Sequence, residues 1–123
     1  QFIEATKAVI IDLANEGNAV IIGRASNLIL KDRADAFHVG LVSTFEDRAK
    51  VFAAREQVTD EEAQRMVTEH ERARVAYFRR FFLAVVDNPA DYHMILNTHH
   101  LTRETTTNVI CDVFAAHLQG RYS

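Results

Sequence analysis

Three short apolar runs, separated from one another by helical sequence, constrain the fold of this chain more than any other feature. The runs are Ala19–Ile22, Phe37–Val42 and Tyr92–Leu96. Strands that alternate with helical crossovers pair in parallel, and both faces of a parallel sheet need a covering of helices. The order of elements therefore predicts an α/β fold, a three-layer parallel sheet with flanking helices.

The segments around these runs are predicted to be helical. Phe2–Glu16 carries apolar residues at helical spacing and is followed by Gly17, where a left-handed cap belongs. Leu28–Leu30 is a short apolar patch that favours a further helical turn. Because a parallel α/β fold usually begins with a strand and this chain begins with a helix, we expect at least one strand upstream of Gln1.

Capping boxes mark the starts of two more helices. In this pattern a Ser or Thr side chain accepts a hydrogen bond from the backbone three residues on, where a Glu stands. Ser43 with Glu46 predicts one start, and Thr59 with Glu62 predicts a long helix that runs to about Phe82. Asp87–Pro89 is predicted to break the long helix, because proline lacks the backbone N–H that a helix needs. The last helix is predicted to run from Thr102 to about Gly120.

The composition is that of an ordinary globular domain. The chain has 123 residues, of which 48% are hydrophobic and 25% charged, and a net charge of −3, so no strong field draws it toward nucleic acid or membranes. Its one cysteine, Cys111, excludes an internal disulfide and suits a reducing compartment. No apolar run approaches the roughly 20 residues of a membrane span. We therefore expect one cytoplasmic domain that binds neither nucleic acid nor membranes.

Arg24 stands where the first apolar run ends, directly after Gly23. Ligands of open α/β sheets bind outside the carboxyl ends of the strands, so an arginine there is placed to meet an anion. Ser26 and Asn27 follow it as additional hydrogen-bonding groups. The alternative is a surface arginine that pairs with a nearby carboxylate.

The long helix carries a second concentration of arginines, Arg65, Arg72, Arg74, Arg79 and Arg80. Arg65 has Glu61 and Glu69 four residues to either side, which is the spacing of a solvated ion-pair ladder. Arg72 and Arg79 have no acid four residues away and share one face of the helix. Uncompensated arginines can surround a phosphate and stabilise the charge that is transferred. The alternative is an exposed polar helix face.

The sequence gives little indication of a metal site or of a catalytic nucleophile. His99 and His100 are adjacent on an extended segment and point apart, whereas a metal site needs three or four converging ligands, so we predict no metal site. Cys111 lacks the flanking residues of a known nucleophile motif. No Gly-x-x-x-x-Gly-Lys motif occurs, so the backbone cradle for ATP phosphates is absent from these residues.

Three stretches of the sequence carry a family resemblance when they are taken together. They are Glu16–Arg24, Glu71–Arg74 leading into Tyr77–Phe82, and Asp91–Thr98 with a helix started at Thr102. In this combination the chain resembles the later part of the cytidylate kinase-like family, within the nucleoside monophosphate kinase group of P-loop enzymes. The resemblance covers nearly the whole chain and keeps the order of elements. It implies a single P-loop kinase-like domain over 1–123, with a lid-like helix at 59–83 and with the first strand and P-loop preceding Gln1.

The resemblance also implies an activity: transfer of the γ-phosphoryl group of ATP, with magnesium, to CMP or a similar nucleoside monophosphate. Arg24, with Ser26 and Asn27, would bind the acceptor phosphate. Arg72 and Arg79 match catalytic lid arginines. Nucleotide contacts would come from Arg74, Asn97, Thr98 and His99. The sequence departs from cytidylate kinases proper at three places, because Ile22, Ala25 and Glu71 stand where that group has aspartate.

Two functional expectations follow. Phosphoryl transfer depends on positioning and electrostatic stabilisation, so residues 1–123 without a donor cradle are expected to be inactive on their own. The alternative is a non-catalytic module that keeps the scaffold for nucleotide binding, regulation or dimerisation, in the last case as a homo-oligomer.

Overall fold

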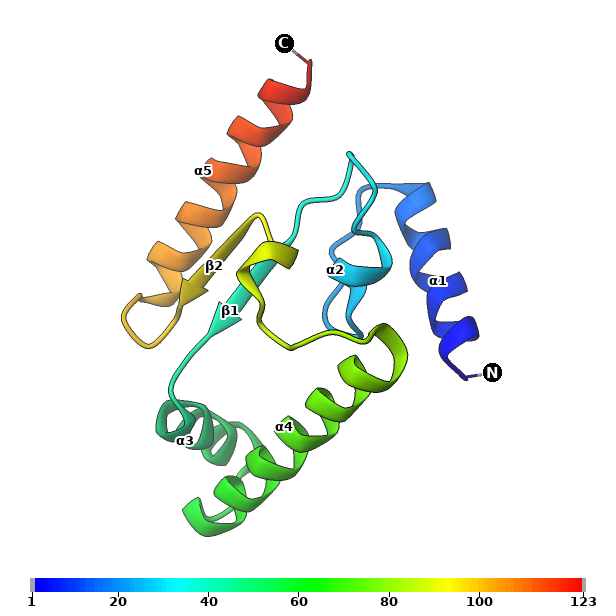
Figure 1. Cartoon of the computed structure of the whole chain (residues 1–123). Helices are drawn as coiled ribbons and strands as arrows, with labels where there is room; N and C mark the ends of the chain where they lie inside the picture. Colours follow the sequence, from blue (N-terminus) through cyan, green and yellow to red (C-terminus); the bar gives the residue numbers. More distant parts are fainter. Residues whose placement is uncertain (1, 123) are drawn as a thin grey trace.

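The computed structural model describes residues 2–122; residues 1 and 123, the limits of the domain expected from the sequence, lie outside the described residues. Helices and two short strands follow one another along the chain (Figure 1). In order they are α1 (Phe2–Glu16), α2 (Ser26–Ile29), β1 (Val39–Val42), α3 (Phe45–Glu56), α4 (Asp60–Phe82), the 3₁₀ helix η1 (Pro89–Asp91), β2 (Met94–Asn97) and α5 (Arg103–Tyr122).

The two strands pair in parallel, as the sequence predicts. Val39 stands opposite Met94, and Val42 opposite Asn97. A side chain at Gly40 would be crowded, because its Cβ would lie 3.1 Å from the Ile95 side chain and 3.2 Å from the Tyr92 ring, so these neighbours would have to shift slightly. Both strands end at the edge of the sheet from which the connections to α3 and α5 depart (Figure 1).

The prediction of a strand at Ala19–Ile22 is wrong for the described residues. The run is not a β-strand and does not pair through backbone hydrogen bonds with any strand that the structure describes. Val20 is 92% exposed and Ile22 is 89% exposed. An extended run becomes a strand only when a neighbour accepts and donates its backbone hydrogen bonds. The described residues therefore form a mixed α/β structure with a small two-stranded parallel sheet.

The capping signals are confirmed for α4 and displaced by one residue for α3. The Thr59 hydroxyl accepts from the Glu62 backbone N–H at 3.1 Å, and the Glu62 carboxylate accepts from the Thr59 N–H at 3.4 Å. At α3 the cap is Thr44, whose hydroxyl accepts from the Asp47 N–H at 3.1 Å. The prediction that Ser43 and Glu46 form a capping box is therefore wrong.

The α3–α4 pair has a small core of its own. Phe52 of α3 packs with Ala63 and Val67 of α4, and all three are buried. Figure 1 shows this helix pair at one end of the molecule, on the side where β1 ends, while α5 lies away from it. The last residue of α4 reaches α1, where the Lys7 ammonium lies over the Phe82 ring. The connection from α4 to β2 returns the chain to the sheet through η1.

Candidate functional site

A hollow of about 480 Å³ opens where α3 and α4 meet, and it concentrates positive charge. Three of its lining residues are arginines and one is an acid, Glu71. Arg72 and Arg79, two turns apart on α4, both lie on its wall, as their spacing on one helix face requires. Neither has an ion-pair partner among the described residues. The structure thus brings these two predicted residues together; their catalytic role stays a prediction.

Arg48 of α3 is the third arginine of the hollow, and it was not predicted as a site residue. Its Nη1 donates to Glu71 Oε2 at 3.0 Å, which joins α3 to α4. Its Nε is buried without a hydrogen-bond partner. Arg48 and Arg72 are far apart in the sequence, and only the packing of α3 on α4 brings them to one place, so no local pattern could have indicated the pairing.

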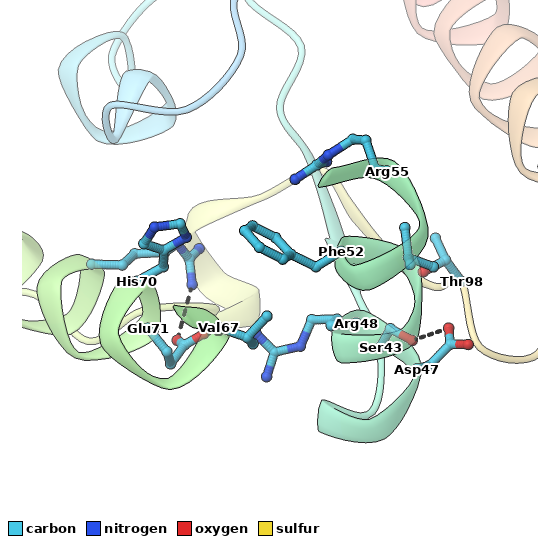
Figure 2. Close-up of a pocket in the computed structure, with 11 residues that line it drawn as sticks. Ser43, Asp47, Arg48, Phe52, Arg55, Val67, His70, Glu71 and Thr98 are labelled. Atoms are coloured by element: carbon cyan, nitrogen blue, oxygen red, sulfur yellow. Dashed lines mark hydrogen bonds and ion pairs between the residues drawn. The ribbon is translucent and has the colours of Figure 1, made fainter. Parts of the chain in front are cut away.

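A second hollow, of about 370 Å³, lies beside the first and reaches the carboxyl ends of the strands. In Figure 2, Arg48 and Phe52 of α3 face Val67, His70 and Glu71 of α4. The edge of the His70 ring meets the Phe52 ring, with 5.7 Å between centroids. The other residues that line this second hollow are Ser43, Asp47, Val51, Arg55, Arg74 and Thr98. The wall between the two hollows is shared, because Arg48 and Glu71 line both.

The carboxyl edge of the sheet holds Thr98 and His99 next to α3. The backbone N–H and the hydroxyl of Thr98 both donate to the Val42 carbonyl, at 2.8 and 3.2 Å. His99 Nδ1 lies 3.9 Å from Asp47 Oδ2, and the Ser43 hydroxyl donates to that same oxygen at 2.7 Å. Thr98 lines the second hollow and His99 lies against it through Asp47, at the edge where open α/β sheets bind ligands.

Asn97 occupies a different position. It is exposed at the end of β2, and its side-chain oxygen accepts from the His99 backbone N–H at 3.0 Å. It lines neither hollow. Its observed task is to shape the turn after β2, so its contact with a nucleotide remains a prediction.

Arg74 is already engaged by other side chains. Nη2 donates to Asp87 Oδ1 at 2.8 Å and Nη1 donates to Asp87 Oδ2 at 3.1 Å. The same group lies 3.6 Å from Glu71 and over the ring of Phe78. Hydrogen bonding to Asp87 is the main cause that raises the pKa of Arg74 above its ordinary value, against the opposing effect of burial. Asp87 is a second residue that local sequence patterns did not indicate.

Arg24 lies apart from the two hollows, in a tight turn that leads into α2. Its carbonyl accepts from the Tyr77 hydroxyl of α4 at 3.3 Å. Burial raises the pKa of Tyr77, and the nearby positive charge of Arg24 partly offsets this rise. Asn27, one turn on, donates to the Asp91 carbonyl at 3.2 Å, and Ser26 opens α2. The structure therefore keeps Arg24, Ser26 and Asn27 together, and none of the three lines either hollow.

No group of three or more His, Cys, Asp or Glu side chains in residues 2–122 is arranged to hold a metal ion. Within the same range, no helix combines the length and the apolar character needed to cross a membrane.

Known proteins are similar to this chain in sequence and in fold. A family model described as the cytidylate kinase-like family matches residues 1–100. A cytidylate kinase from Pyrobaculum calidifontis is 25% identical over 115 residues, which are 94% of this chain and 62% of that protein. A crystal structure of an uncharacterized protein from Eubacterium ventriosum superposes with a TM-score of 0.83 at 20% identity, over 93% of this chain and 65% of that one. The chain therefore spans less than two thirds of either relative, and the structural match shows a shared fold.

Proposed function

Because the chain belongs to the cytidylate kinase-like family, we propose that it forms the acceptor and lid part of a domain that transfers the γ-phosphoryl group of ATP to CMP or a similar nucleoside monophosphate. One observation carries this proposal. Arg72 and Arg79 have no ion-pair partner among the described residues and line one hollow together with Arg48. Cations without internal partners are available to an anionic ligand, and arginine presents a fork that matches phosphate oxygens.

Most of the predicted residues have a task in this proposal. Arg72 and Arg79 stabilise the negative charge of the phosphoryl group that is transferred. Arg24, Ser26 and Asn27 bind the acceptor phosphate, and Thr98 and His99 contact the base of the donor nucleotide. Magnesium arrives with ATP, because it is commonly held by substrate phosphates and a few carboxylates rather than by a closed protein cage. Magnesium held by the phosphates of ATP would neutralise part of their negative charge.

Binding and transfer are separable in this proposal. The 123 residues contain no Gly-x-x-x-x-Gly-Lys motif to cradle the donor phosphates. We therefore expect the chain on its own to bind phosphate-bearing ligands without forming CDP from ATP and CMP. A coupled assay for ADP release tests the second half of this statement.

The binding half is tested by isothermal titration calorimetry of the chain with inorganic tripolyphosphate, CMP and AMP. Replacing Arg72 and Arg79 by Ala together should weaken tripolyphosphate binding about tenfold or more, since charge-assisted hydrogen bonds are lost. Arg65→Ala is the matched control, on the same helix and outside both hollows. Equal losses in the control and the double variant, or no binding by the unaltered chain, would contradict the proposal.

A non-catalytic module on the same scaffold is the second candidate, and the run Ala19–Ile22 favours it. Val20 and Ile22 are almost fully exposed, and uncovered apolar surface commonly marks an interface. In this candidate the chain self-associates through the run. Sedimentation velocity separates the two: a dimer that Val20→Asp abolishes supports the module, whereas a monomer that binds tripolyphosphate supports the kinase part.

A further inference from the structure

Arg74 and Asp87 form an ion pair with two hydrogen bonds, an arrangement that Arg33 and Asp35 also adopt among the described residues. Both oxygens of Asp87 accept from both terminal nitrogens of Arg74, at 2.8 and 3.1 Å. Such fork-to-fork pairs fix the relative orientation of two groups as well as their distance. Both side chains are 38% exposed, so the pair is screened only in part by solvent. It joins the middle of α4 to the connection that leads to β2.

That connection has few other side-chain attachments. Leu83 is 91% exposed and Val85 is 73% exposed, so neither holds the segment by packing. Leu83 and Asp87 adopt left-handed backbone conformations, with φ of +51° and +57°, which are unfavourable for residues with a Cβ. A segment with such a backbone keeps its path only where its surroundings fix it. The Arg74–Asp87 pair is one side-chain contact that does so, and the Asn27 side chain, which donates to the Asp91 carbonyl, is another.

Arg74 does not line the arginine-lined hollow, and its side chain lines the second hollow instead. It is two residues from Arg72 and five from Arg79, so helix geometry separates it from them by about 140–160° around the axis. The rotation of α4 about its axis decides whether Arg72 and Arg79 face the hollow. A tether on the opposite face can fix that rotation.

We propose that Arg74 is a positioning residue, whose ion pair with Asp87 orients α4 so that Arg72 and Arg79 line the hollow. The inference rests on the proposed function, and it gives Arg74 a role other than contact with the nucleotide. The two roles predict opposite results for Asp87→Asn. If Arg74 bound phosphate directly, removal of the competing carboxylate would strengthen binding. If Arg74 orients α4, the same change weakens binding, although it removes a negative charge.

Calorimetric titration of the chain with tripolyphosphate measures this sign. Asp87→Asn and Arg74→Gln should each weaken binding by about three- to fivefold, the scale of a partly exposed ion pair. The exchanged pair, Arg74→Asp with Asp87→Arg, should regain most of the affinity. Asp91→Asn is the charge-matched control, since the Asp91 carboxylate is in no ion pair of the described residues. Tighter binding by Asp87→Asn, or an exchanged pair as weak as Arg74→Gln, would overturn the inference.

Amide hydrogen exchange gives a second readout that needs no ligand. In Asp87→Asn, exchange should quicken in residues 83–88 and in the last turns of α4, and the exchanged pair should slow it again. Unchanged exchange in both variants overturns the tether. If the tether is seen and the unaltered chain binds no tripolyphosphate, the proposed function has failed and the positioning contact has not.

Discussion

At the scale of single residues, the turn before α2 stores backbone strain around Arg24. Gly23, Arg24 and Ala25 have φ of +78°, +59° and +56° in succession. Glycine adopts this region freely, whereas a residue with a Cβ pays about 1–2 kcal/mol there. Ala25 is 3% exposed, so its methyl group recovers part of this cost by packing. Arg24 is exposed, so packing does not offset the cost of its left-handed backbone. Strained residues of this kind are often found at functional sites.

Arg24→Gly should therefore stabilise the chain while removing the candidate phosphate contact. We expect the free energy of unfolding to rise by about 0.5–1 kcal/mol, after allowance for the greater freedom of glycine in the unfolded state. Urea unfolding at 25 °C measures it. Calorimetry with CMP should show weaker binding in the same variant.

Arg24→Ala is the control for this prediction, because it keeps the Cβ and the strain. Its stability should stay within about 0.5 kcal/mol of the unaltered chain, and its affinity for CMP should fall as in Arg24→Gly. Two results would count against the interpretation: a glycine variant no more stable than the alanine variant, or CMP binding that neither variant changes.

At the scale of elements, the start of α4 depends on its capping box. Thr59→Ala removes the hydroxyl that accepts from Glu62 and should lower the free energy of unfolding by about 1 kcal/mol. Thr68→Ala is the matched control, because the hydroxyl of Thr68 bonds only to the Gln64 carbonyl within the helix. Chemical denaturation of both variants tests the prediction, and equal losses would show that the cap is not what matters.

The α3–α4 pair should behave as a separate cooperative unit. These helices pack chiefly on each other, and Phe52 is the largest member of their core. Phe52→Ala should cost about 3 kcal/mol and remove amide protection from α3 and α4 before β1 and β2 are affected. Val51→Ala, on the exposed side of α3, should leave protection unchanged. Simultaneous loss of protection in the helix pair and the sheet would contradict this division.

Sequence patterns predicted the elements whose signals are local, and failed where the signal was degenerate or absent. The period and cap of α4 lie within its own sequence, so its bounds were predictable. Ser43 and Thr44 are each followed three residues later by an acid, so the pattern fits both and only the end of β1 decides between them. Arg48 and Asp87 join the site through tertiary packing, which no periodicity encodes.

At the scale of the whole molecule, a cluster of histidine rings joins the beginnings of both strands to α5. Phe37 stacks on His93 with 4.8 Å between ring centroids, and His117 of α5 meets His93 at 4.9 Å. His93 Nδ1 accepts from the His38 backbone N–H at 2.9 Å, which requires that nitrogen to be unprotonated. Figure 1 shows α5 standing clear of the α3–α4 pair, so this cluster belongs to its attachment at the sheet.

Acidification should weaken the fold through this cluster. Burial lowers the pKa of His38, with a smaller effect from His93, and burial followed by His117 lowers the pKa of His93. A histidine whose pKa is lowered in the folded state binds fewer protons there than in the unfolded state. Its stabilising effect is therefore complete above a pH of about 6.5, the unfolded value, and is lost as the pH falls from there toward the lowered folded pKa.

Thermal unfolding measured between pH 7.5 and 5.5 should accordingly give a constant Tm at the upper end and a falling Tm below. His117→Phe keeps a ring against Phe37 and removes the smaller of the two effects that lower the pKa of His93, the larger being burial, so its Tm should fall less over the same range. His100→Gln, whose ring contacts His99 rather than the cluster, should follow the unaltered profile. A Tm that rises on acidification would contradict the sign of the effect. If His117→Phe follows the unaltered profile, the effect of His117 on the pKa of His93 is not a source of the pH dependence.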